Sequence, residues 1–236
     1  MKRLLPFLII LAVLAVALGS AWYMRRAANA PAAGVAGAGN SSSVPGTSSR
    51  PTVSTITAPG AVPPQTKGSS TATVTVEEFG DFECPPCALL HPILQTMEKE
   101  FEGRIRIIFR EYPLVPNHQH ALYAASAAEA AALQGKFWEM HHKLYENQKT
   151  WHEAFDVRPI FDDYAKQIGL DLERFKRDIN SDGVARRITE DGKRGRSLNV
   201  KGTPTVFMNG REVPFETIMD AGRFRNAITA ELSNPR

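Results

Sequence analysis

Cysteine is nearly absent from this chain: only Cys84 and Cys87 occur among its 236 residues. Two cysteines are too few for the disulfide framework of small secreted domains, and they exclude a four-cysteine zinc site. A Cys2His2 site would need two of the six histidines, and no spacing in the sequence supports a standard zinc finger. We therefore expect no metal and no other cofactor, and we expect the histidines to be surface or capping residues.

Acidic residues are absent before Glu77. The formal net charge of +3 therefore belongs to the N-terminal part, and residues 72–236 carry more acidic than basic side chains. A clustered basic face, the usual feature of a nucleic-acid-binding protein, is missing. We expect no nucleic-acid partner.

The sequence has one long apolar run, over residues 4–24, and pairs of basic residues flank it on both sides. Its length is close to the roughly 20 residues that a membrane-spanning helix needs. We predict an uncleaved anchor over residues 1–26, with the rest of the chain outside the cytoplasm, on the periplasmic or cell-surface side. A cleaved signal peptide ending at the Ala-Asn-Ala sequence of residues 28–30 is the alternative. Both interpretations export the domain to an oxidising compartment.

Residues 27–71 lack both aromatic and acidic side chains and consist mainly of alanine, glycine, serine, threonine, proline and valine. Such a segment buries too little apolar surface to offset the entropy lost on ordering. We predict a flexible linker, which serves either as a tether that lets the domain reach partners near the membrane or as a plain spacer. The folded domain is then expected over residues 72–236.

Hydrophobic periodicity predicts that this domain begins with a β-α-β unit. Residues 73–79 and 104–109 alternate apolar and polar side chains, which is typical of strands. Between them, residues 85–102 show helical spacing after two prolines that suit a first turn, and Gly103 ends the pattern. The two strands should be parallel.

A helical insertion over about residues 117–198 follows, and the chain ends with a hairpin and a helix. Within the insertion we predict a long helical region and three shorter helices, at residues 118–147, 159–168, 171–179 and 182–198, with Asp171 and Asp182 as N-caps. Asn209-Gly210 between residues 205–208 and 211–213 is a strong hairpin signal, and a last helix is expected over residues 215–232.

The two cysteines form a C-x-x-C pair at the predicted start of the first helix, which is the layout of a thiol–disulfide exchange site. The helix dipole and the unsatisfied N–H groups there favour a thiolate on Cys84. Cys87 lies deeper in the first turn and is the expected resolving thiol of a Cys84–Cys87 disulfide. Glu83, as a carboxylate, would disfavour the Cys84 thiolate. A buried reduced pair without activity is the plain alternative.

Four segments carry a resemblance to a known family: VEEFGDFECPPC (residues 76–87), FREYPL (109–114), QGKFWEM (134–140) and VKGTPT (200–205). With the predicted order of elements, they resemble the DsbA-like thiol–disulfide oxidoreductases, and the resemblance spans nearly the whole predicted domain. It implies an α/β, thioredoxin-like fold (β-α-β, helical insertion, β-β-α) and a thiol:disulfide oxidoreductase activity.

The resemblance also implies further site residues. Glu78 matches the buried acid that relays protons for the inner cysteine in this family. Thr203 and Pro204 match the cis-proline loop, which faces the C-x-x-C segment with its Pro85 and Pro86 and presents backbone groups to an extended client. From the residues alone, Glu78 could equally be a surface strand residue, and Pro204 an ordinary trans proline at an edge strand.

The direction of the reaction is less sharply defined by the sequence, because Pro86 stands where DsbA-type oxidases often have histidine. We predict a monomer that oxidises cysteines of exported client proteins and is recharged by a membrane quinone reductase of the DsbB or VKOR type. A reductase or isomerase fed by a DsbD-like transporter, for example in cytochrome maturation, is the alternative. A non-catalytic copper-binding module is a second alternative.

Overall fold

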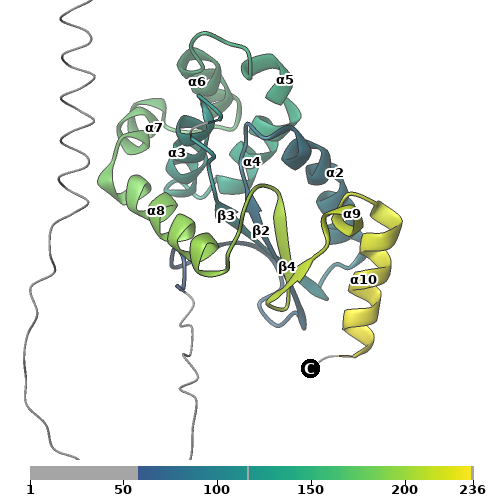
Figure 1. The fold of residues 1–236 in the computed structure, drawn as a ribbon. Coiled ribbons are helices and arrows are strands. Elements are labelled where there is room, and N and C mark those ends of the chain that lie inside the picture. The colour runs from purple at the N-terminus through teal and green to yellow at the C-terminus, as the bar shows by residue number, and fades with distance from the viewer. Residues whose placement is uncertain (1–57, 116, 235–236) are drawn as a thin grey trace, which may run out of the picture. The chain divides into compact units, whose positions relative to one another are not determined.

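Five strands form one mixed sheet in the computed structural model, which describes residues 58–115 and 117–234 (Figure 1). The strand order is β1-β3-β2-β4-β5. The neighbouring strands β2 (Val74–Gly80) and β3 (Ile105–Glu111) are parallel, and all other neighbours are antiparallel. The predicted α/β arrangement is confirmed, with one additional strand, β1 (Gln65–Gly68), that the sequence pattern did not predict.

The β-α-β unit forms as its periodicity predicted. Helix α2 (Pro85–Glu100) begins with two prolines, whose missing N–H groups cost nothing in a first turn. It ends before Gly103, which has a φ of 75°, a conformation that glycine adopts without strain. The parallel register places Glu78 of β2 beside Phe109 of β3. Residues 81–84 connect the carboxyl end of β2 to the first turn of α2.

Helices α2 and α10 (Ala221–Ser233) pack together and against the sheet (Figure 1). Alternate side chains of the strands share one face of a sheet, so β2, β3 and β4 (Thr205–Met208) contribute to one core. That core includes Val74, Val76, Leu90, Leu94, Met97, Ile105, Ile107, Val206, Phe224 and Ile228. A register slip of one residue would turn the apolar side chains of a strand away from this core, which fixes the register.

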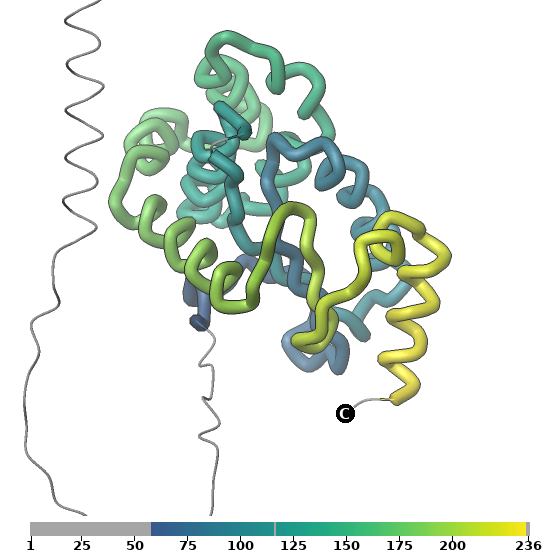
Figure 2. The backbone as a smooth tube through the Cα atoms, in the orientation of Figure 1, coloured from purple at the N-terminus to yellow at the C-terminus, as the bar shows by residue number. Residues whose placement is uncertain are grey.

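The insertion between β3 and β4 is helical, as predicted, and Figure 2 shows the chain leaving β3, passing through these helices and returning to the sheet. Trp151 and Phe161 are fully buried within it, with ring centroids 5.3 Å apart in an edge-to-face contact. The helices of the insertion are α3 (Ala121–Ala132), α4 (Phe137–Glu146), α5 (Gln148–Trp151), α6 (Arg158–Gln167), α7 (Leu172–Ile179) and α8 (Asp182–Ser197).

Two predicted helices are each divided in the structure. The long helical region of residues 118–147 consists of α3 and α4, and Gly135 between them has a φ of 74°. The last helix of residues 215–232 consists of α9 (Phe215–Ile218) and α10, because the Asp220 side chain caps a new helix. Apolar residues recur across both breaks, so the hydrophobic pattern alone did not reveal them.

The observed turn and cap residues match the predicted ones except at the start of α8. Asn209 and Gly210 have φ values of 48° and 78° and join β4 to β5 (Arg211–Val213), as the Asn-Gly signal predicted. Asp171 caps α7 as predicted. The cap of α8 is Ser181 rather than Asp182, since the Ser181 hydroxyl accepts the hydrogen bond from the helix backbone.

The predicted end of the flexible linker at residue 71 is wrong. Strand β1 lies within the predicted linker and pairs antiparallel with β3. Residues 58–63 are held by side chains from distant elements: Arg110 donates to the carbonyl groups of Pro59 and Ala61, and Arg194 donates to that of Ala58. Composition alone was misleading here because backbone pairing and the side chains of Arg110 and Arg194, rather than apolar burial, order this segment. Residues 27–57 lie outside the described residues.

The anchor predicted over residues 1–26 also lies outside the described residues. Within residues 58–115 and 117–234, no helix is both long enough and apolar enough to cross a membrane. The anchor stays a prediction.

Candidate active site

Cys84 and Cys87 lie where the chain leaves β2 and enters α2. Cys84 is the N-cap residue, and the N–H of Cys87 in the first turn donates to the Cys84 carbonyl at 3.1 Å. Among the described residues no side chain caps this helix, so its first N–H groups and its dipole act on Cys84. Cys84 retains 4% exposure and Cys87 none, and both are free cysteines. Cys84 is therefore the thiol that a client sulfur can reach.

The pKa values of the two thiols are driven apart. The pKa of Cys84 is lowered from 9.0 to about 6, chiefly because the Cys87 thiol donates a hydrogen bond to it, while burial opposes this effect. Burial and the same hydrogen bond raise the pKa of Cys87 well above its usual range. At neutral pH the pair thus consists of a Cys84 thiolate and a protonated Cys87. A thiolate of low pKa is available as a nucleophile and leaves readily from a mixed disulfide.

The loop before β4 reaches the cysteine pair. The Thr203–Pro204 peptide bond is cis, as the resemblance implied. Sγ of Cys84 lies 3.3 Å from the Thr203 carbonyl oxygen, to which it donates a hydrogen bond when it is protonated. The Thr203 hydroxyl has no hydrogen-bond partner among the described residues, and it lowers the pKa of Cys84 because it can donate to the thiolate. The structure holds a second cis peptide bond, between Val62 and Pro63, which the sequence analysis did not predict.

Glu78 is buried in β2, between Phe109 of β3 and Val206 of β4 in the sheet register. Its Oε1 has no hydrogen-bond partner within the described part of the chain. Burial raises the pKa of Glu78 to about 8, and the charge of Cys84 adds to the effect. Glu78 in turn contributes to the raised pKa of Cys87. At neutral pH Glu78 is thus a neutral acid close to both thiols, and its surface alternative is excluded by its burial.

Asp81, and not Glu83, is the carboxylate that raises the pKa of Cys84. The Glu83 side chain turns toward the insertion, where its Oε2 accepts the backbone N–H of His120 at 2.6 Å. Asp81 is buried, and its Oδ2 lies 2.7 Å from Nδ1 of His118. The expectation for Glu83 was wrong because closeness in sequence does not determine where a side chain points.

Gln148, at the start of α5, was not anticipated from the sequence. Its amide Nε2 donates to the backbone carbonyls of Phe82 and Cys84, at 2.7 and 3.0 Å. All three residues are buried. The insertion therefore holds the segment that carries Cys84 in place. A glutamine at the start of a short helix offers no local signal of this role.

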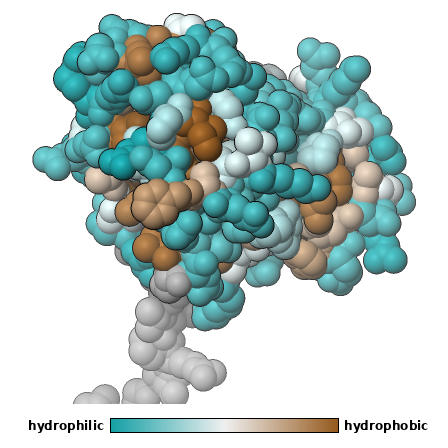
Figure 3. Space-filling view, turned by 90° about the horizontal axis from the view of Figure 1, so that it is seen from above, coloured by the Kyte–Doolittle hydropathy of each residue, from teal (hydrophilic) through white to brown (hydrophobic). Residues whose placement is uncertain are grey.

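An apolar groove of about 540 Å³ lies beside the first two turns of α2. Pro85, Ala88 and Leu89 line one side, and Tyr145 lines the other. Leu89 is 64% exposed. Pro86, the other residue between the cysteines, is not part of its lining. A space-filling view from above shows apolar groups gathered in separate patches on an otherwise hydrophilic surface (Figure 3).

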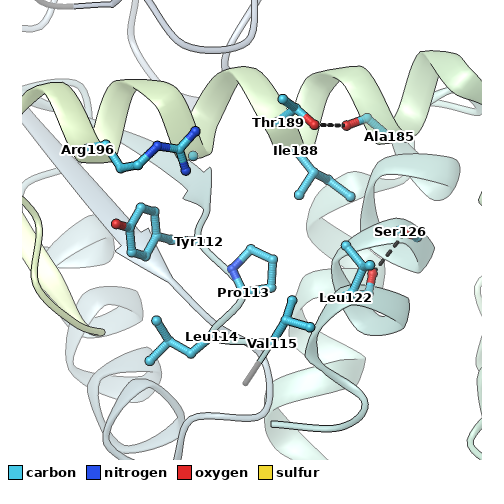
Figure 4. Close-up of a pocket in the computed structure, with 11 residues that line it drawn as sticks. Tyr112, Pro113, Leu114, Val115, Leu122, Ser126, Ala185, Ile188, Thr189 and Arg196 are labelled. Carbon is cyan, nitrogen blue, oxygen red and sulfur yellow. Dashed lines mark hydrogen bonds between the residues drawn. The ribbon is translucent and has the colours of Figure 1, made fainter. Parts of the chain in front are cut away.

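A second pocket of about 510 Å³ lies between α3, α8 and the segment after β3 (Figure 4). Leu114, Leu122 and Ile188 give it an apolar lining. The hydroxyl groups of Ser126 and Thr189 both donate to carbonyls of their own helices, so these two groups are already satisfied. No residue of the C-x-x-C segment lines this pocket.

The histidines do not all lie at the surface or at helix ends. His91 of α2 and His141 of α4 are buried, and His142 is partly buried. One ring nitrogen from each of these three residues lies within 4.8 Å of the corresponding nitrogens of the other two. His91 and His142 are 51 positions apart, so no sequence spacing indicated the cluster.

The chain is similar to known proteins over most of its length. A family model described as "Thioredoxin" matches residues 62–230. A probable disulfide bond formation protein D of Bacillus cereus is 31% identical over 153 residues, covering 62% of this chain and 70% of the relative. Among solved structures, oxidised BdbD of Bacillus subtilis is 25% identical, with a TM-score of 0.64, over 75% of this chain and 99% of that one. The thiol-disulfide exchange protein alpha-DsbA2 of Wolbachia pipientis, at 24% identity and a TM-score of 0.61, shares the fold.

Other relatives are much longer than the matched segment. An Na(+)/H(+) antiporter NhaA 1 of Mycolicibacterium vanbaalenii is 36% identical over 148 residues, and the match covers 61% of this chain but 23% of the antiporter. The chain thus spans less than a quarter of the length of that relative.

The fold and the cysteine pair define a thioredoxin-type redox domain with a helical insertion. The chain belongs to the thioredoxin family and, within it, to the DsbA-like thiol:disulfide oxidoreductases.

Proposed function

We propose that this protein oxidises cysteines of exported proteins by dithiol–disulfide exchange through Cys84 and Cys87. The observation that carries the proposal is the separation of the two thiol pKa values. A stabilised thiolate stabilises the reduced enzyme and makes its disulfide more oxidising, by about 30 mV per pKa unit. At pH 7 only the part of the shift below pH 7 counts, because a thiol with a higher pKa is mainly protonated, so lowering the pKa of Cys84 from 9.0 to about 6 is worth roughly 30 mV.

The exchange proceeds through a mixed disulfide. A client thiolate attacks Sγ of Cys84 in the Cys84–Cys87 disulfide, and Cys87 leaves with the electron pair and takes a proton, for which the buried Glu78 is the candidate donor. A second client thiolate then attacks the client sulfur of the mixed disulfide, and Cys84 leaves as its stabilised thiolate. The client loses two electrons and gains a disulfide, and the enzyme gains two electrons.

Two surfaces support binding of an extended client segment. The Thr203 carbonyl lies 3.3 Å from the Cys84 sulfur, so backbone groups of the cis-proline loop are available beside the reacting atom. The groove next to Pro85 offers apolar contacts through Ala88 and the exposed Leu89. Backbone pairing and a shallow apolar groove favour broad rather than sequence-specific recognition.

Continuous oxidation requires a partner that removes electrons from the reduced pair. A membrane quinone reductase of the DsbB or VKOR type would serve, with this protein held near it by the apolar run of residues 4–24 and its domain outside the cytoplasm. Two-thiol exchange needs one domain only, so we propose that the protein acts as a monomer.

A reductase or isomerase is the second candidate, and two observations favour it. Pro86 leaves no imidazole between the cysteines, and the buried Asp81 raises the pKa of Cys84. Both make the disulfide less oxidising than the helix start and the Cys87 hydrogen bond alone would make it.

The reduction potential distinguishes these directions. The full chain is equilibrated with glutathione buffers, and the fraction of Cys84–Cys87 disulfide is measured. An oxidase is expected near or above roughly −150 mV. A potential near or below roughly −250 mV would place the protein with the reductants and overturn the proposed direction.

A further inference from the structure

We propose that His91, His141 and His142 form a binding site for a divalent transition-metal ion of the Zn²⁺ class, separate from the cysteine pair. One ring nitrogen from each residue lies within 4.8 Å of the other two. Nε2 of His91 and Nδ1 of His142 are 3.3 Å apart. With a metal–nitrogen bond of about 2.0–2.1 Å, two nitrogens of a tetrahedral site lie about 3.3 Å apart. One edge of such a site is therefore already formed, and a small approach of His141 completes the third ligand.

His141 supplies an independent reason to expect a ligand. Both of its ring nitrogens are buried, and neither has a hydrogen-bond partner in the described part of the chain. The ring is surrounded by aromatic side chains, with Phe109 and Tyr145 at centroid distances of 4.7 and 4.9 Å. Buried polar groups in proteins are normally satisfied, because leaving them without a partner is costly. A metal ion bound to one ring nitrogen would give His141 the polar partner that its aromatic surroundings do not provide.

The cluster is held in the protonation state that metal binding needs. Burial lowers the pKa of all three imidazoles, and that of His91 falls to about 4. Neutral imidazole is the ligating form. The three rings come from α2 and α4, so the ion would join the helix that carries the cysteines to the helical insertion.

A small cavity adjoins the three rings. A cavity of about 20 Å³ is lined by the three histidines together with Glu78, Lys67 and Trp138. A cavity of this size accommodates about one water molecule. Three imidazoles around an ion leave a fourth position for water, as in many zinc sites. Imidazole ligands are shared by Zn²⁺, Co²⁺, Ni²⁺ and Cu²⁺, whereas Mg²⁺ and Ca²⁺ prefer oxygen.

Lys67 is the one described cation beside the site and works against it. Its Nζ lies 3.5 Å from Nε2 of His142 and 3.0 Å from a carboxylate oxygen of Glu98. Its side chain is 33% exposed, so it can turn toward solvent when an ion binds. If an ion binds here, removal of the Lys67 charge should strengthen its binding. A cluster of histidines with only a structural role would show no such effect.

The test is a titration of the full chain with Zn²⁺ in competition with a chromophoric chelator. Cys84 and Cys87 are first oxidised to their disulfide, so that no thiolate competes for the ion. One equivalent of Zn²⁺ is expected to bind and to raise the melting temperature, because an ion that binds only the folded state stabilises it. Co²⁺ at the same site is expected to show the intense visible bands of tetrahedral coordination.

Three variants locate the ion. His142→Gln should weaken Zn²⁺ binding by roughly 100-fold or more, since even outer-shell changes cost 10–100-fold, and should abolish the rise in melting temperature. Lys67→Met should tighten binding several-fold by removing a like charge. His152→Ala, which removes a histidine outside the cluster, should change neither the Zn²⁺ affinity nor the rise in melting temperature. The proposal is overturned if the wild-type chain binds no stoichiometric metal, or if His142→Gln and Lys67→Met leave the affinity unchanged.

Discussion

Glu77 and Glu78 are consecutive residues of β2 with opposite electrostatic environments. Glu77 forms ion pairs with Arg110 and Arg194, each with a nitrogen–oxygen distance of 2.7 Å. Burial alone would raise the pKa of Glu77, but the hydrogen bonds and charges of the two arginines lower it. Glu78 has no such partner among the described residues, and its pKa rises to about 8. Consecutive strand residues point to opposite faces of a sheet, so Glu77 and Glu78 belong to two different regions of the molecule.

The two regions differ in what their charges do. On the side of Glu77, paired charges that include Asp191 fix the segment before β1 and the end of α8 to the sheet. On the side of Glu78, incompletely satisfied groups have pKa values near or within the physiological range, which is what proton transfer during thiol exchange needs. The comparison indicates that the paired carboxylate of Glu77 suits a structural role, whereas the unpartnered acid of Glu78 is available for proton transfer.

Removing the nucleophile should have the largest effect. Cys84→Ser is expected to abolish catalysis of disulfide exchange while the fold persists, because no other described thiol is exposed to a client. Cys87→Ser should instead accumulate client mixed disulfides on Cys84, which electrophoresis without reductant detects. Mixed disulfides on the Cys84→Ser protein would overturn the assignment of the two roles.

Glu77→Gln should produce the largest loss of stability. It leaves the partly buried Arg194 without its carboxylate and the buried Arg110 with Asp191 alone, and breaking a buried ion pair typically costs about 3–5 kcal/mol. Urea denaturation measures the free energy of unfolding. Exchange activity at a temperature where the variant is folded should be close to that of the wild type. A large loss of activity in the folded variant would remove the distinction between the two regions.

Glu78→Gln should increase the free energy of unfolding at pH 7, whereas Glu77→Gln should decrease it. The folded-state pKa of Glu78 is raised from 4.5 to about 8, so the folded protein binds more protons than the unfolded chain between these values. Its stability therefore falls as the pH rises through this window. The variant should lose this dependence and gain up to roughly 3 kcal/mol at pH 7.

The same variant tests the chemical role of Glu78. If the acid donates a proton to Cys87, Glu78→Gln should slow the opening of the Cys84–Cys87 disulfide and flatten its pH profile between pH 6 and 9, in a range set by the pKa of about 8. Glu77→Gln is the matched control. A stabilised variant with an unchanged pH–rate profile would leave Glu78 a structural residue only.

Thr203→Val should have the smallest effect of these substitutions. The Thr203 hydroxyl lowers the pKa of Cys84, so its removal should raise that pKa toward the usual value and make the disulfide slightly less oxidising. The ultraviolet absorbance of the thiolate, followed against pH, measures the change. Thr203→Ser keeps the hydroxyl and should match the wild type. Equal shifts in both variants would attribute the effect to packing rather than hydrogen bonding.

Sequence reasoning succeeded where neighbouring residues carry the information. The strands around α2, the hairpin at Asn209 and the cysteine pair are local patterns, and the structure contains them as expected. It failed where a contact joins distant segments. Strand β1 is held by β3, and Gln148 reaches Cys84 from 64 positions away, so neither has a local signature.

By itself, the sequence determined that this protein has a C-x-x-C pair at a helix start within a thioredoxin-like order of elements, because periodicity and spacing are properties of short segments. The tertiary structure decided the rest. It determined which of two consecutive glutamates is ionised, which carboxylate acts on Cys84, and that three histidines from two helices meet. These properties depend on burial and on charges from distant parts of the chain, and both exist only once the chain has folded.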